Sequence, residues 1–205
     1  MRIVLGLEYC GVGFCGWQSQ LQGCGVQDAL EAAVSVIAGE KMSIIAAGRT
    51  DTGVHAALQV VHFDTAANRP LTAWVRGVNS HLPAGVAVLW AREVNEDFHA
   101  RFAATHRGYR YVLLNHPVRP AINRGLIGWH HRPLDAAAMN LAAAHLIGQH
   151  DFSAFRAAAC QAKSPVKELR LAHVERRGDY LLCDFHADGF LHHMVRNLMG
   201  CLIQV

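Results

Sequence analysis

Lysine is scarce in this 205-residue chain: only Lys41, Lys163 and Lys167 stand among its 19 basic residues. Acidic residues are missing altogether from residues 98–134. The same segment carries several arginines, namely Arg101, Arg107, Arg110, Arg119, Arg124 and Arg132. A guanidinium binds phosphate through parallel hydrogen bonds and stacks on bases, so this pattern is typical of a surface for folded RNA. An ordinary solvated face explains this feature, taken alone, equally well.

Long apolar runs are also missing. The longest candidate, residues 136–147, is interrupted by Asn140 and His145 and is shorter than the roughly 18 residues of a membrane span. The N-terminal sequence reaches Glu8 too early for a signal peptide. The length allows one large domain or two compact halves, each with its own core. We therefore expect a soluble, cytoplasmic protein.

Metal-binding patterns are absent from the cysteines and histidines. The cysteines form no C-x-x-C pair and no zinc-finger spacing with histidine: Cys10, Cys15, Cys24, Cys160, Cys183 and Cys201. The doublets His130-His131 and His192-His193 belong to no H-E-x-x-H sequence. We expect reduced cysteines that mostly pack in the core, structural or RNA-facing histidines, and no bound metal.

Hydrophobic periodicity divides residues 1–103 into the order β-α-β-β-α-β. Alternation predicts strands over 2–9, 42–46, 58–63 and 86–94, and helical spacing predicts helices over 26–37 and from Pro70 to Val78. Residues 104–205 repeat the order as β-α-β-β-α. Strands are predicted over 105–114, 168–175 and 180–187, the last two as a hairpin about residues 177–179, with helices over 135–147 and 190–202.

The element order predicts an α+β fold of two ferredoxin-like halves, residues 1–103 and 104–205. Such halves can join edge to edge into one mixed, mainly antiparallel sheet, with helices on one face and a central cleft on the other. The second half lacks the last strand of the pattern.

One turn between two apolar segments stands out, with the sequence Gly48-Arg49-Thr50-Asp51-Thr52-Gly53-Val54-His55-Ala56. Its glycines permit unusual backbone angles, and its threonines can bond to the main chain nearby. Asp51 is therefore presented from a turn. For an isolated T-D-T-G sequence, a structural turn or helix-capping aspartate is the commoner interpretation.

The sequence around this turn resembles the signature of the tRNA pseudouridine synthase A family, G-R-T-D-x-G-V-H-A. The resemblance implies that Asp51 is the catalytic nucleophile and that Arg49 contacts phosphate or ribose. It implies isomerisation of uridine to pseudouridine at positions 38, 39 and 40 of the tRNA anticodon stem and loop. It further implies a homodimer, no cofactor, and a pseudouridine synthase fold that continues past residue 205, so that this chain looks truncated.

The glycine-rich loop after the first strand has two interpretations. Residues 11–16 contain a literal G-x-G-x-x-G, which would indicate dinucleotide binding, but further glycines intervene before the helix. The family has Y-D-G-T-x-F-x-G-W-Q-x-Q here, and Phe14, Gly16, Trp17, Gln18 and Gln20 agree with it. Cys10 and Val12 replace the usual aspartate and threonine, so the contacts of those side chains are lost.

Two later segments resemble the family as well. Residues 98–102 and 107–111 match F-H-A-R-F and R-x-Y-R-Y, and the resemblance assigns Tyr109 to stacking on the target uracil. Residues 190–197 match F-L-x-H-M-V-R-N, and the resemblance makes Arg196 the basic partner of the catalytic carboxylate. On pattern alone, a core tyrosine and a surface helix arginine explain these residues equally well or better.

The chemical path stays open at this point. Asp51 could attack C1′ of the ribose, attack the uracil ring, or remove a ribose proton to give a glycal. The alternative function is a noncatalytic RNA-binding or RNA-chaperone module, which shares the arginines but leaves Asp51 without a purpose.

Overall fold

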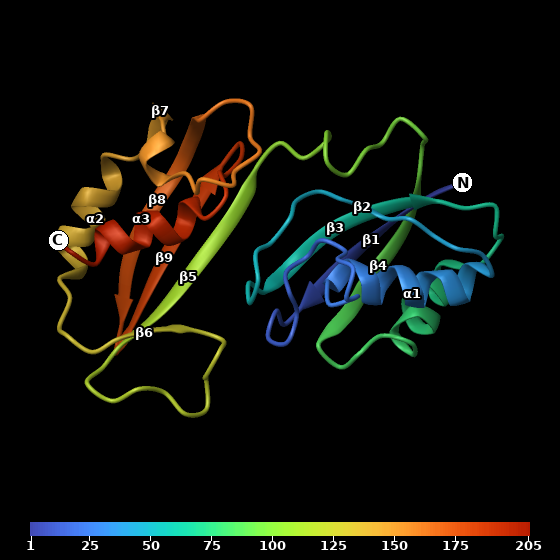
Figure 1. The fold of residues 1–205 in the computed structure, drawn as a ribbon, viewed down its shortest axis with the longest axis horizontal. Coiled ribbons are helices and arrows are strands. Elements are labelled where there is room, and N and C mark those ends of the chain that lie inside the picture. Colours follow the sequence, from blue (N-terminus) through green and yellow to red (C-terminus); the bar gives the residue numbers. More distant parts are fainter. The chain divides into compact units, whose positions relative to one another are not determined.

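The computed structural model describes residues 1–205, which divide into two compact units, Met1–Ala104 and Thr105–Val205. Each unit has its own sheet, its own helices and its own hydrophobic core (Figure 1). None of the helices has the length and apolar character that crossing a membrane requires.

The first unit has the strand order of a ferredoxin-like fold, β2-β3-β1-β4, with every neighbouring pair antiparallel. Its elements are β1 (Arg2–Tyr9), α1 (Val26–Ala38), β2 (Ile45–Ala46), β3 (Ala56–Asp64), the π-helical turn η1 (Ala73–Gly77) and β4 (Val86–Val94). The predicted β-α-β-β-α-β order is confirmed for this unit. The second helix is brief and π-helical at its centre.

The core of the first unit lies between the sheet and α1. Alternate residues of β1, Ile3, Leu5 and Leu7, face the buried side of α1, where Leu30 and Val34 recur at helical spacing. The helix ends at Gly39, whose left-handed backbone (φ 77°) closes it through a bond to the Ser35 carbonyl.

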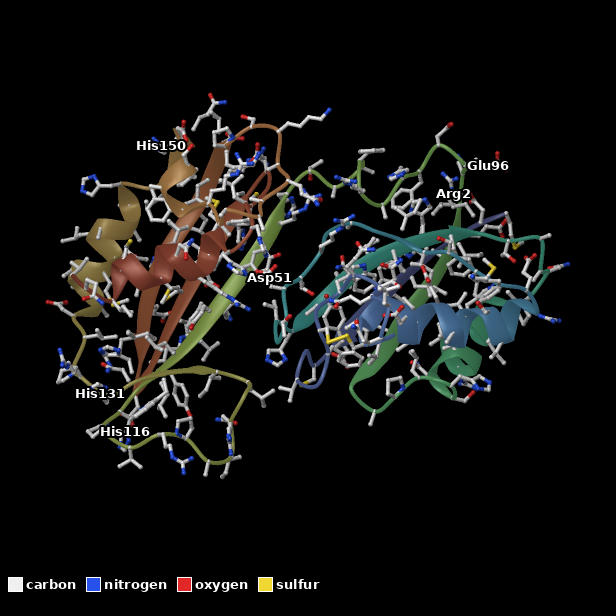
Figure 2. All side chains as sticks on the ribbon, in the orientation of Figure 1. Arg2, Asp51, Glu96, His116, His131 and His150 are labelled. Atoms are coloured by element: carbon white, nitrogen blue, oxygen red, sulfur yellow. A yellow bond between two sulfur atoms is a disulfide. The ribbon has the colours of Figure 1, made fainter.

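The segment 95–104 covers part of the opposite face of this sheet, around Arg2 and His62. His62 of β3 is 1% exposed, and its Nδ1 accepts a hydrogen bond from the Ala100 amide at 3.2 Å. Arg2 pairs with Asp64 at 2.7 Å and also donates to the carbonyls of Glu96 and Phe98 (Figure 2). The F-H-A-R-F sequence is thus tied to the sheet by one buried imidazole and one guanidinium.

The second unit has the strand order β6-β5-β9-β8-β7. Its elements are β5 (Arg107–Asn115), β6 (Gly128–His130), α2 (Ala136–Ala144), β7 (Gly148–Asp151), the 3-10 turn η2 (Ser153–Phe155), β8 (Val166–Arg177), β9 (Tyr180–Ala187) and α3 (Met194–Leu202). The predicted hairpin is confirmed as β8 and β9, joined at Gly178, whose φ is 59°.

The central strands β5-β9-β8 follow a ferredoxin-like order without its fourth strand. Where that strand would lie beside β5, only β6 pairs, in parallel and along Leu113–Asn115. Helices α2 and α3 supply Met139, Ala143, Leu198 and Leu202 to the core on one face of this sheet. The α+β class and the mainly antiparallel pairing are confirmed.

The strands form a four-stranded and a five-stranded sheet, one in each unit, and the joining of the two halves into a single sheet stays a prediction. Residues 95–103, which follow β4, form turns closed by the Asn95 and His99 carbonyls and do not continue as a strand. Alternation in a sequence shows which face of a strand is buried and carries no information about its edge partner.

Candidate active site

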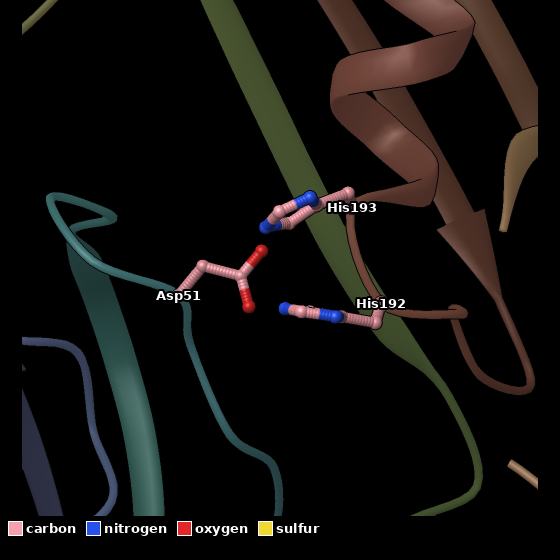
Figure 3. A group of neighbouring side chains, drawn as sticks. All are labelled: Asp51, His192 and His193. Atoms are coloured by element: carbon pink, nitrogen blue, oxygen red, sulfur yellow. The ribbon is translucent and has the colours of Figure 1, made fainter. Parts of the chain in front are cut away.

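Asp51 lies in the loop between β2 and β3, outside any helix or strand (Figure 3). Its side chain is half-buried, and its carbonyl accepts a hydrogen bond from the Val54 amide at 3.1 Å. Gly53 takes a left-handed conformation (φ 77°) that completes the turn. The structure therefore presents Asp51 from a turn, as its sequence predicts.

Hydrogen bonds from three residues, Trp17, Tyr9 and Gln59, hold this loop in place. The Trp17 amide donates to the Thr50 carbonyl at 2.9 Å, and the Tyr9 hydroxyl bonds to Thr50 Oγ1 at 2.8 Å. In addition, the side-chain Nε2 of the buried Gln59 donates to the Gly48 carbonyl at 2.8 Å. The chain just before Asp51, at Gly48 and Thr50, is thus anchored to buried residues, which restricts where the carboxylate can lie.

The glycine-rich loop after β1 packs against the loop that carries Asp51. Gly16 has φ 101°, and a Cβ at this position would lie 2.9 Å from the Thr50 carbonyl oxygen and 3.2 Å from the Thr52 amide. Only glycine allows so close an approach of the two backbones. The dinucleotide-binding interpretation is wrong, because β1 pairs antiparallel with both neighbours and α1 begins only at Val26.

The same loop corrects the expectation for the cysteines. Cys15 and Cys24 form a disulfide with their Cα atoms 5.4 Å apart, while the other four cysteines are free. Residues 16–23 fold back, so that the Cys15 amide donates to the Cys24 carbonyl at 2.9 Å. A spacing of nine residues matches no short cysteine motif, so the pair becomes visible only when the loop is folded.

Arg49, two residues before Asp51, is exposed at the rim of the loop. Its place beside a half-buried carboxylate suits contact with the backbone of an incoming polyanion, because a guanidinium binds phosphate while largely in water.

Tyr109 lies on β5 of the second unit. The predicted alternation is confirmed: Arg107, Tyr109 and Tyr111 are half-buried, whereas Arg110 is exposed on the other face and pairs with Asp184 at 2.7 Å. The Tyr109 ring meets Phe190 edge to face, with centroids 5.0 Å apart. That contact restricts the orientation of the phenol ring.

The segment 190–197 departs from its predicted helix. Helix α3 begins at Met194, because His193 has a left-handed backbone (φ 62°) and ends the preceding turn. His192 and His193 therefore lie outside the helix, with ring centroids 4.0 Å apart (Figure 3). The predicted helix over residues 190–202 is therefore wrong for its first four residues.

Arg196 lies in the first turn of α3. It lines a hollow of about 170 Å³ together with Tyr111, Trp129 and His130. Its neighbour Asn197 donates to the Phe155 carbonyl at 3.0 Å, which fixes this turn of the helix against η2. Arg196 and Tyr109 are thus both held on ordered elements of the second unit.

Sequence reasoning missed the residues that hold the Asp51 loop, Tyr9 and Gln59 above all. Both appeared only as members of strands. Their signal is weak but present: each is a polar-tipped side chain at an inward-facing strand position, where a buried hydroxyl or amide needs a partner.

The fold and the site define an α+β protein of two ferredoxin-like units, one with a braced turn that presents a carboxylate and the other with arginine and tyrosine side chains on ordered elements. Comparison with known proteins identifies the family. The chain belongs to the tRNA pseudouridine synthase family, whose model matches residues 7–103 and 142–205.

Similar curated proteins cover the whole chain. It is 80% identical to tRNA pseudouridine synthase A of Thiobacillus denitrificans and 61% identical to the same enzyme of Dechloromonas aromatica. All 205 residues align, spanning 79% and 78% of those proteins. Arg49, Asp51 and Arg196 lie within the residues matched by the family model, and Tyr109 lies between its two segments.

Proposed function

We propose that this chain isomerises uridine to pseudouridine in the anticodon stem and loop of tRNA, at positions 38, 39 and 40. The observation that carries the proposal is the braced Asp51 turn, in a chain that belongs to the tRNA pseudouridine synthase family. Relatives that align with every residue of the chain are named as this enzyme. A noncatalytic RNA-binding module would need no such carboxylate.

The reaction exchanges one bond of the nucleoside for another. The C1′–N1 bond breaks, the base turns, and a C1′–C5 bond forms; the C5 hydrogen leaves as a proton and N1 gains one. Atoms and electrons balance within the nucleoside, so no oxidant or reductant takes part. Asp51 serves as the nucleophile that holds the intermediate while the base turns.

The substrate-binding roles follow from the chemistry of three side chains. A uridine in a stem must leave its stack, which costs a few kcal/mol. We propose that stacking on Tyr109 offsets part of this cost and that Arg49 holds the flanking phosphate. Arg196 is proposed as the cation that keeps the Asp51 carboxylate ionised during the reaction.

The cellular compartment and the oligomeric state are also part of the proposal. We propose that it acts in the cytoplasm on tRNA and works as a homodimer, as the family resemblance implies. Light scattering at several protein concentrations tests the dimer: a mass twice the chain's 22.4 kDa supports it, and a mass of one chain at all concentrations contradicts it.

Release of tritium tests the activity. An anticodon stem-loop carrying [5-³H]uridine loses tritium to water only when C5 becomes the glycosidic carbon. Wild-type protein should release it, Asp51→Ala should not, and the control Asp97→Ala should behave as wild type, because Asp97 is an exposed acid of the same unit. Equal RNA binding with no release from any protein would support the RNA-binding module.

A further inference from the structure

The contact between β1 and the Asp51 loop lies outside the roles assigned so far. Tyr9 is the last residue of β1 and is 4% exposed, and its register partners in the sheet are Ala56 and Val86. Its hydroxyl reaches Thr50 Oγ1 at 2.8 Å, directly before Asp51 in the chain. We propose that Tyr9 and Thr50 are a positioning pair that sets the orientation of the Asp51 carboxylate for the isomerisation, an inference that rests on the proposed function.

The pair connects a buried strand of the unit to a loop that has no regular secondary structure. The Tyr9 ring packs on Trp17, with centroids 5.8 Å apart, and Trp17 is 1% exposed. The Trp17 amide then donates to the Thr50 carbonyl at 2.9 Å. Thr50 is thus held at its side chain by Tyr9 and at its main chain by Trp17, which leaves its peptide link to Asp51 little freedom to rotate.

The protonation of Tyr9 suits this role. Burial raises the pKa of the Tyr9 hydroxyl more than its hydrogen bonds with Thr50 and Gln59 lower it. The phenol therefore keeps its proton throughout the working pH range and always has a hydrogen to share with Thr50. Removal of either the Tyr9 or the Thr50 hydroxyl breaks the hydrogen bond between them.

The loop has no regular structure that could replace the pair. Between β2 and β3 the main chain around Asp51 forms a turn, with a hydrogen bond from the Val54 amide to the Asp51 carbonyl. A misplacement of about 1 Å in a reacting group costs roughly 100-fold in rate. We expect loss of the Tyr9 hydroxyl to lower kcat about tenfold, because Trp17 still holds the Thr50 carbonyl.

Four variants test the pair. Tyr9→Phe and Thr50→Val each remove one hydroxyl at nearly constant volume, the double variant removes both, and Thr50→Ser keeps the hydroxyl. Each single variant should lower kcat about tenfold with KM and RNA affinity unchanged. The double variant should lose no more than either single one, because residues that act through one bond are not additive. Thr50→Ser should restore most of kcat.

A matched control separates positioning from general stability. Thr65 is 6% exposed, and its hydroxyl accepts from the Ala67 amide at 3.0 Å in the same unit. Thr65→Val should lower the midpoint of urea unfolding as Tyr9→Phe does and leave kcat unchanged. The inference is overturned if Tyr9→Phe and Thr50→Val keep wild-type kcat, or if Thr65→Val lowers kcat equally.

A second measurement keeps the inference separate from the proposed function. Amide hydrogen exchange of Val54 reports opening of the Asp51 turn without any substrate. Tyr9→Phe should speed this exchange about tenfold, and Thr65→Val should not. If wild-type protein releases no tritium from the stem-loop, the proposed function is wrong. If Tyr9→Phe leaves the amide exchange of Val54 unchanged, the positioning pair is wrong, whatever the outcome of the tritium assay.

Discussion

Gly16 offers a direct perturbation of the Asp51 loop without the removal of any polar side chain. A Cβ there would lie 2.9 Å from the Thr50 carbonyl oxygen, against the 3.4 Å at which ordinary contact begins, so Gly16→Ala must move one backbone by about 0.5 Å. Since a 1 Å error costs about 100-fold in rate, this shift should lower kcat roughly tenfold. Tritium release from the labelled stem-loop measures it.

The same loop supplies a matched control. Gly13 has φ 86°, and a Cβ there meets nothing within 4 Å. Both alanine variants carry the backbone cost of a positive φ, about 1–2 kcal/mol of unfolding free energy, which urea titration measures. Only Gly16→Ala adds the contact with Thr50, so only it should lower kcat. Equal kcat in the two variants would refute the claim that the loop after β1 positions Asp51.

Three other predictions concern stability. Burial lowers the pKa of His62 below its usual 6.5. The free energy of unfolding is therefore highest above about pH 6.5 and falls below it, because the unfolded chain takes up a proton there more readily than the folded protein. The difference between the urea midpoints at pH 8 and pH 5.5 should be smaller in His62→Asn than in wild type. Reduction of the Cys15–Cys24 disulfide should lower the free energy of unfolding by about 2–3 kcal/mol and expose two additional thiols to titration; an unchanged thiol count would contradict it. Arg2→Gln should lower the urea midpoint more than Arg110→Gln does, because the side chains are 16% and 59% exposed and Arg2 also binds two backbone carbonyls; equal losses would contradict this ranking.

Where alternation or helical spacing is long and uninterrupted, the sequence predicted the fold well. Strands 2–9 and 86–94 appear with the expected ends, and α1 stops before Gly39 as predicted. The short strands β6 and β7 escaped prediction, because three or four residues are too few to establish a period.

Tertiary hydrogen bonds explain the strand that was predicted too long. Of residues 42–46, only Ile45 and Ala46 join the sheet. The Met42 amide donates to Ser35 Oγ at 2.9 Å, and the Ile44 amide donates to Glu31 Oε1 at 2.9 Å. These backbone groups bond to side chains of α1 and not to a neighbouring strand. No pattern within residues 42–46 could reveal that choice.

Backbone conformation explains the helix ends that were placed wrongly. Helix α2 ends at Ala144, because the next residues form tight turns before Gly148 (φ 113°) starts β7. In α3 the start moves to Met194, because His193 adopts a positive φ that is uncommon for a residue other than glycine. Apolar periodicity continues through both boundaries and does not register such a turn of the main chain.

For the candidate site, the sequence identified the carboxylate but not what holds it. The G-R-T-D-T-G-V-H-A sequence was enough to single out Asp51, since turn residues and family resemblance coincide there. The contacts from Tyr9 and Trp17 come from residues 41 and 33 positions earlier than Thr50. Such contacts depend on the folded sheet, and a single sequence contains no local sign of them.

The most direct test of the central claim is the single-turnover rate of pseudouridine formation by Asp51→Asn, an isosteric change that removes only the negative charge and the nucleophile. We predict that the variant binds the anticodon stem-loop as wild type does and forms product on the order of 10³-fold more slowly, or more slowly still. A rate for Asp51→Asn equal to that of wild type would contradict the account.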